Sequence, residues 1–197
     1  RSIDGKSMKP LQALGIQTNS LGFLMQDDAP AIWRGPMATQ ALTQLVTQTA
    51  WEDLDYLIID MPPGTGDIAL TMAQKIPLVG AVIVTTPQDM ALADVRKGLR
   101  MFQQVNVPVL GIVENMSVHT CSQCGHTEAI FGQHGGKEMA ETYNVPWLGA
   151  LPLAMKIREQ TDAGKPTVLA EPDSSEARLY HEIATKVAAN VAALPGD

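Results

Sequence analysis

The sequence predicts a doubly wound α/β fold with a mostly parallel sheet, and three observations support this prediction. Short apolar runs rich in β-branched residues alternate with segments that have the length and spacing of amphipathic helices. The runs are continuously apolar, which is typical of strands buried on both faces. With 197 residues, 45% of them hydrophobic, the chain can bury the core that such a fold needs.

The strands of this sheet are expected in five places, of which four are apolar runs followed by turn residues. In chain order the five are Gly15–Leu21, Tyr56–Asp60, Gly80–Thr85, Val109–Val113 and Trp147–Leu151. Strands that alternate with helices in this way indicate parallel pairing, with helices covering both faces of the sheet.

Five segments are predicted to be helical from the spacing of their apolar residues. They are Pro36–Ala50, Gly66–Gln74, Asp89–Gln104, Gly136–Tyr143 and a final helix at about Ser174–Ala193. The final helix has one apolar face, and its opposite face is mixed and nearly neutral in charge. We therefore predict a helix that packs on the core and does not anchor the chain to a membrane.

Composition and charge exclude several classes of partner. The formal net charge of -7 leaves no diffuse basic surface for a polyanion, so no nucleic-acid partner is expected. No apolar run approaches the roughly 20 residues that cross a bilayer, and no secretory signal opens the chain. We therefore expect no membrane contact. The two cysteines, three positions apart, suit a metal or redox site in a reducing compartment, so a cytoplasmic protein is expected. Residues 1–197 are expected to form a single globular unit.

The stretch Tyr56–Asp67 points to a nucleotide site. Its apolar run ends in Asp60, which a parallel sheet would place at the carboxyl edge where open α/β folds bind ligands. An aspartate there can hold Mg²⁺ beside phosphates, and Gly64 and Gly66 let backbone N–H groups approach a phosphate closely. The alternative is a strand that ends in an aspartate helix cap followed by a plain turn.

A P-loop would complete such a site, but the printed sequence contains none. The tripeptide Gly5-Lys6-Ser7 lacks the glycine that a P-loop requires upstream, and Pro10 obstructs the helix that should follow. We therefore reject this tripeptide as a phosphate-binding loop.

The segment His119–His126 holds the chain's two cysteines, Cys121 and Cys124, at the C-x-x-C spacing of a metal site. Two thiolates are half of the four ligands that zinc or a [4Fe–4S] cluster takes. Either His119 and His126 complete the shell, or the cysteines of a second copy of the chain do so across a two-fold axis. We favour the second copy, because a histidine beside so tight a turn would have to bend back sharply to reach the metal. The remaining alternative is a redox dithiol or a pair of ordinary thiols.

Together, five motifs resemble the Mrp/ApbC branch of the MinD/ParA-like deviant-Walker P-loop ATPases, a family of iron–sulfur cluster carriers. The resemblance covers about Gly15 to Thr167. The motifs are WRGPM (Trp33–Met37), DYLIIDMPPGTGD (Asp55–Asp67), VTTPQDMALADVRKG (Val84–Gly98), GIVENMS (Gly111–Ser117) and CSQCGH (Cys121–His126).

The resemblance implies a role for five residues. Asp60 matches the Walker B acid on the magnesium side, and Gly64 matches the switch II glycine whose N–H meets the terminal phosphate. Asn115 matches the asparagine that reads adenine, with a turn-forming residue as the alternative reading. Cys121 and Cys124 match the cluster-binding pair at the homodimer interface.

The resemblance also implies the function: an ATP- and Mg²⁺-dependent carrier that binds a [4Fe–4S] cluster between two subunits and passes it to recipient apoproteins, with zinc as a surrogate metal. The family's P-loop KGGVGK[ST] is not in the sequence. We therefore expect the C-terminal portion of a slow ATP hydrolase, inactive by itself. The alternatives are a MinD/ParA-like positioning ATPase and a zinc-stapled, non-enzymatic dimeric scaffold.

Overall fold

A computed structural model of the chain describes residues 7–24, 35–61, 64 and 66–195. The chain divides into two compact units, Arg1–Pro77 and Leu78–Asp197, and each is considered by itself. That residues 1–197 form one domain stays a prediction.

Unit 1 begins with a short antiparallel hairpin of β1 (Leu11–Ala13) and β2 (Ile16–Thr18). Leu14 and Gly15 join the strands with φ values of 54° and 79°, the left-handed backbone that two-residue hairpin turns use. The expected strand near Gly15–Leu21 is therefore present as β2, but it is shorter and pairs in an antiparallel hairpin. A 3₁₀ turn, η1 (Leu21–Leu24), follows it.

The core of unit 1 lies between two helices that the sequence predicted. The first, α1 (Gly35–Thr47), packs against α2 (Asp67–Lys75). Among the side chains of unit 1 whose burial the structure describes, the buried apolar ones are Leu45, Ala69, Met72, Ala73 and Ile76.

The predicted strand at Tyr56–Asp60 is wrong. The segment has irregular backbone and pairs with no strand among the described residues, and 83% of the surface of Ile58 is exposed. An apolar run supplies side chains for a strand, but the strand also needs a neighbour whose backbone pairs with its own N–H and C=O groups. Composition alone did not show that this neighbour was missing.

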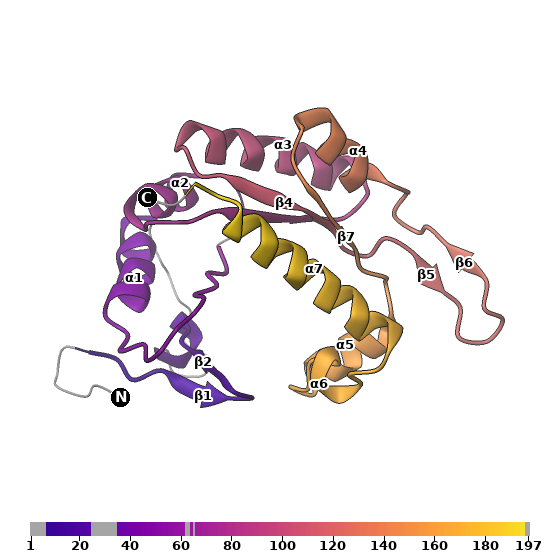
Figure 1. Cartoon of the computed structure of the whole chain (residues 1–197), viewed down its shortest axis with the longest axis horizontal. Coiled ribbons are helices and arrows are strands. Elements are labelled where there is room, and N and C mark those ends of the chain that lie inside the picture. The colour runs from indigo at the N-terminus through magenta and orange to yellow at the C-terminus, as the bar shows by residue number, and fades with distance from the viewer. Residues whose placement is uncertain (1–6, 25–34, 62–63, 65, 196–197) are drawn as a thin grey trace. The chain divides into compact units, whose positions relative to one another are not determined.

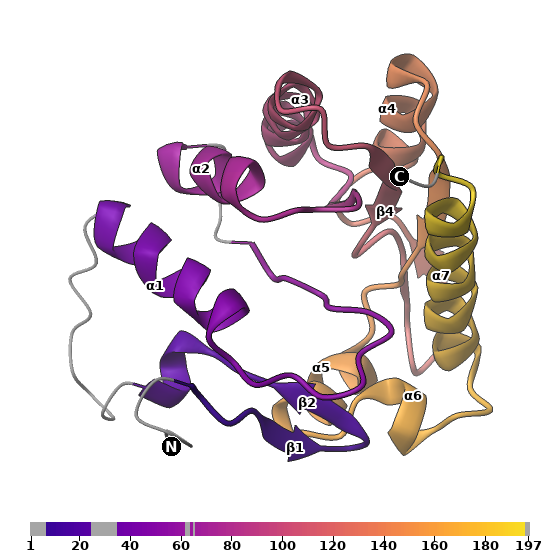
Figure 2. The same ribbon diagram turned by 60° about the vertical axis from the view of Figure 1, so that its left-hand side comes forward.

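Unit 2 contains the parallel sheet. Its strands β3 (Ala81–Thr85), β4 (Val109–Glu114) and β7 (Trp147–Ala150) lie in the order β3-β4-β7, and both pairings are parallel. Helices α3 (Asp89–Gln104) and α4 (Gly135–Tyr143) cover one face, and α7 (Ser175–Ala192) covers the other over β4 and β7 (Figures 1 and 2). The predicted doubly wound α/β fold is confirmed.

The C-terminal helix α7 packs on the sheet as predicted. Its contacts to the core cluster of Val113, Leu148 and Leu151 come from Leu179, Tyr180, Ile183 and Val187. Two polar side chains also bind the strands: Lys186 Nζ donates to the Leu148 carbonyl and Asn190 Nδ2 to the Leu110 carbonyl, each at 2.7 Å. Within the described residues no helix is both long and apolar enough to cross a membrane.

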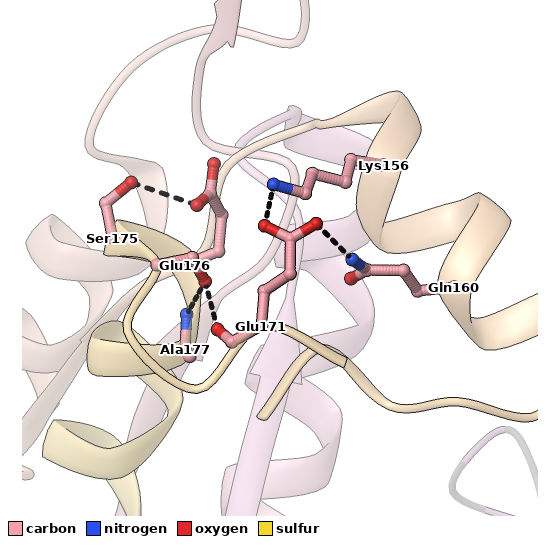
Figure 3. A network of polar contacts seen from close by, with 7 residues as sticks. Lys156, Gln160, Glu171, Ser175, Glu176 and Ala177 are labelled. Carbon is pink, nitrogen blue, oxygen red and sulfur yellow. Dashed lines mark hydrogen bonds and ion pairs between the residues drawn. The ribbon is translucent and has the colours of Figure 1, made fainter. Parts of the chain in front are cut away.

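Two helices between β7 and α7 were not predicted. They are α5 (Met155–Asp162) and α6 (Thr167–Ala170). Helix α5 buries no residue, so its sequence has no apolar stripe from which a helix could be predicted. Polar contacts hold this region together (Figure 3). Glu171 pairs with Lys156 and accepts from Gln160 Nε2 at 3.1 Å, and Ser174 Oγ caps α7 by accepting from Ala177 N–H at 3.1 Å.

Candidate functional site

Both cysteines lie in the turn of a small antiparallel hairpin in unit 2. Its strands are β5 (His119–Thr120) and β6 (Thr127–Glu128), and Figure 1 shows the hairpin extending beyond the sheet. Cys121 N–H donates to the His126 carbonyl at 2.8 Å, and Gly125 N–H donates to the Cys121 carbonyl at 2.9 Å. Gly125 has a φ of 72°, the left-handed conformation that glycine favours and that closes the turn.

The turn stabilises the thiolate form of Cys121. Both thiols are free; Cys121 is half-buried and Cys124 is exposed. Backbone N–H groups of Cys124 and Gln123 hydrogen-bond to the Cys121 sulfur and lower the pKa of this thiol, and nearby His119 adds to the effect. Because the thiolate is the form that binds metal ions, the turn favours metal binding at this sulfur.

The described residues gather no group of three or more His, Cys, Asp or Glu side chains that could hold a metal ion. His119 instead points its Nδ1 atom at the Leu153 carbonyl, 3.0 Å away, and His126 is exposed. Thus the donor set of the hairpin fits half of a thiolate metal site, and two further ligands have to come from elsewhere.

Asn115 lies at the carboxyl end of β4, where open α/β sheets bind ligands. Its N–H donates to the Thr85 carbonyl at 2.6 Å, and its Oδ1 accepts from Met116 N–H at 2.9 Å. Met116 has a φ of 54°, so Asn115 does take part in a tight turn. No partner of Nδ2 is seen among the described residues.

Glu114, directly before Asn115, was not identified from the sequence as a structural residue at the carboxyl edge of the sheet. Its side chain is only 3% exposed, and Oε2 accepts from Gly136 N–H, in the first turn of α4, at 2.7 Å. The carboxylate therefore binds the start of α4 to the end of β4. The available signal was a charged residue that ends an otherwise apolar strand.

Asp60 and Gly64 lie in unit 1, whereas Asn115 and the cysteine hairpin lie in unit 2. Asp60 is exposed, and Gly64 has a φ of 87° with no described atom within 4 Å of the place a Cβ would take. The backbone at Gly64 is therefore open to close approach. Pro62, Pro63 and Thr65, and also Trp33 and Arg34 of the WRGPM motif, lie outside the described residues. The roles of Asp60, Gly64, Asn115, Cys121 and Cys124 stay predictions.

Comparison with known proteins identifies the family. Residues 1–188 match the ParA family model described as NUBPL iron-transfer P-loop NTPase. The chain belongs to this family. The predicted relationship to iron–sulfur carrier P-loop NTPases is thereby confirmed.

Curated relatives of this NUBPL-like chain include proteins from bacteria and an animal. An "Iron-sulfur cluster carrier protein" of Pseudomonas fragi is 61% identical over 92% of this chain and 63% of the relative, and one of Escherichia coli (strain K12) is 55% identical over 96% and 52%. The "Iron-sulfur cluster transfer protein NUBPL" of Mus musculus is 49% identical over 95% and 59%. The chain thus spans about half to just under two thirds of the length of these relatives.

Two solved structures share the fold of this chain. A nucleotide-binding protein of Archaeoglobus fulgidus in complex with ADP is 32% identical, with a TM-score of 0.71 over 89% of this chain and 68% of that protein. The cell division ATPase MinD of Pyrococcus furiosus, at 22% identity and a TM-score of 0.57 over 77% of this chain and 58% of MinD, shows the same fold.

Proposed function

We propose that the chain is the cluster-binding part of an ATP-dependent iron–sulfur cluster carrier, with Cys121 and Cys124 as its ligands. The observation that carries this proposal is the hairpin turn, which presents two free thiols and aims backbone N–H groups at one of the sulfurs. The names of the relatives, cluster carrier and cluster transfer proteins, support it.

The cargo of the hairpin is a [4Fe–4S] cluster shared by two copies of the chain. Such a cluster takes four thiolates, and a two-fold axis beside the turn doubles the two that one chain offers. An exposed hairpin suits this arrangement, because the cysteines of two copies can meet at its tip and separate again when the cluster leaves for an apoprotein.

The nucleotide part of the proposal rests on Asp60, Gly64 and Asn115. In a longer chain that includes a P-loop, Asp60 binds Mg²⁺, Gly64 N–H binds the terminal phosphate and Asn115 binds adenine. ATP would then act through the Pro62–Asp67 loop on the affinity of the dimer for its cluster. The ADP complex of the Archaeoglobus protein supports nucleotide binding in this family.

Cluster transfer tests the proposal directly. After anaerobic incubation with iron and sulfide, we expect about two iron and two sulfide per chain, and loss of this cluster when an apo-ferredoxin that takes a [4Fe–4S] cluster is added. The measurements are iron and sulfide content and the visible spectrum of the re-isolated ferredoxin. A chain that takes up zinc but transfers no cluster would instead be the zinc-stapled scaffold, and a chain that takes up neither would favour the positioning ATPase.

Asn115→Ala is expected to weaken ATP binding by about 1–3 kcal/mol in a version of the chain that includes a P-loop, because the polar edge of adenine loses its partner. Asn115→Asp keeps an oxygen for Met116 N–H and removes the amide donor, so it should weaken binding as well.

Asn106→Ala is the matched control for this titration. Asn106 is also a turn residue, with a positive φ of 56°, but it precedes β4 and so lies at the opposite end of that strand. Calorimetric titration with ATP measures all three variants. Unchanged affinity in both Asn115 variants would return this residue to the role of a turn former.

A further inference from the structure

The cysteine hairpin is joined to the sheet by a second stretch of backbone, residues 151–153, here called the anchor segment. Three backbone hydrogen bonds pair it with the last residue of β4 and with the chain between β4 and β5. Leu151 N–H donates to the Glu114 carbonyl at 2.8 Å, Ser117 N–H to the Leu151 carbonyl at 3.0 Å, and Leu153 N–H to the Val118 carbonyl at 2.8 Å. This pairing continues in the direction of the cysteines.

Two side chains extend the pairing. Ser117 Oγ donates to the Leu151 carbonyl at 3.0 Å, and His119 Nδ1 lies 3.0 Å from the Leu153 carbonyl. A carbonyl oxygen only accepts, so Nδ1 carries the hydrogen and donates it. His119 is therefore the last point at which the anchor segment holds the chain before Cys121.

The anchor segment is itself fixed in the core of unit 2. Leu151 is 7% exposed and packs with Val113 and Leu148 against α7. The hairpin, in contrast, has strands of two residues each, and a two-stranded hairpin of this size has little stability by itself. The orientation of its turn thus depends on its attachment to the anchor segment.

We infer that His119 is a positioning residue for the metal site: its Nδ1–H bond to the Leu153 carbonyl orients β5, and with it Cys121, for ligation. The inference rests on the proposed function, because it assumes that the two cysteines bind a metal. A ligand that is held in place before the metal arrives loses less conformational freedom on binding, which raises affinity.

A different role for His119 makes a different prediction. A metal-binding histidine commonly donates one ring nitrogen to a carbonyl and coordinates the metal through the other. Nε2 of His119 would be that second nitrogen. The absence of a three-residue ligand group among the described residues favours the positioning role, and the absorption spectrum of a bound metal separates the two roles.

The experiment is an anaerobic titration of the 197-residue chain with Co²⁺, whose d–d and thiolate charge-transfer bands report the ligand set. The variants are His119→Ala, His119→Gln, which places its amide near the position of Nε2, and His119→Asn, which places it near Nδ1. His126→Ala is the control, since its side chain is exposed at the other end of the turn and its backbone carbonyl is kept.

We expect His119→Ala and His119→Gln to lower the affinity for Co²⁺ about 10-fold or more, because losing a group that supports a metal ligand commonly weakens metal binding by that factor. The affinities of His119→Asn and of the control should stay within about twofold of the parent. The Co²⁺ bands should keep their positions in every variant. Rescue by asparagine also excludes a mere loss of folding, which circular dichroism checks independently.

Two results would overturn the inference. The first is that His119→Ala binds Co²⁺ as tightly as the parent. The second is that the Co²⁺ absorption bands shift in all three His119 variants and that His119→Asn does not restore affinity, which would make His119 a ligand. Failure of the proposed function looks different. There, Cys121→Ser and Cys124→Ser would leave Co²⁺ binding unchanged.

Discussion

Cys121→Ser and Cys124→Ser are each expected to abolish metal binding and metal-dependent dimerisation together. Each chain supplies two thiolates, and tetrahedral zinc or a [4Fe–4S] cluster takes four, so two chains are needed to fill one site. Loss of one thiolate per chain leaves two sulfurs for the whole dimer. In the proposed shared site the metal binds the dimer and not the monomer, so removing the metal with a chelator should shift the parent chain toward monomer.

The measurement combines metal content per chain with molar mass by light scattering, before and after chelation. The parent should hold one zinc or one cluster per two chains. Ser122→Ala is the matched control, since Ser122 is exposed in the same turn and lies between the two cysteines. One metal per chain in a monomer would contradict the shared site and favour a local knuckle of two cysteines and two histidines.

Gly111→Ala is expected to lower the free energy of unfolding by about 3 kcal/mol or more, through backbone strain and through collision of the new Cβ. Gly111 lies in β4 with a φ of 147°, a conformation that L side chains rarely adopt. A Cβ there would also stand 2.6 Å from both the Pro146 carbonyl oxygen and Leu148 Cγ. Leu148 is 1% exposed, and Ile112, the next residue of β4, pairs with β7 and donates its N–H to the Pro146 carbonyl, so neither neighbour can move away cheaply.

Gly164→Ala separates strain from collision. Gly164 has a φ of 67°, but no described atom lies within 4 Å of the place its Cβ would take. We expect this variant to lose about 1 kcal/mol of the free energy of unfolding, the cost of a left-handed backbone for a residue with a Cβ. Urea unfolding followed by circular dichroism gives both values. Equal losses in the two variants would show that contact with Leu148 and Pro146 contributes nothing.

The sequence predicted those parts of the fold that depend on local patterns. Helix α3 has apolar residues at helical spacing. The sheet strands β3 and β4 are apolar runs with several β-branched residues, and β7 is a short apolar run, so local patterns were sufficient for these strands as well. The turn that holds Cys121 and Cys124 could also be predicted from a local pattern, because the motif consists of two cysteines and the glycine that follows them, Gly125.

Features that depend on a distant partner could not be predicted. Tyr56–Asp60 has the composition of a strand but no strand beside it among the described residues. Glu114 is buried because Gly136, far along the chain, donates to its carboxylate. The attachment of His119 to Leu153 depends likewise on a contact between segments that no local pattern connects.

The anchor segment follows the cysteines in the chain, with β6, α4 and β7 between them, and this order has a consequence for biosynthesis. On the ribosome, Cys121 and Cys124 emerge before the residues that hold their hairpin, and the helix α7 that packs against Leu151 emerges last of these elements. For that interval the two thiols belong to an unanchored nascent chain. We therefore expect metal loading of the proposed cysteine site to follow translation, and the unfinished chain to be the form in which the thiols are most exposed to oxidants and to competing metal ions.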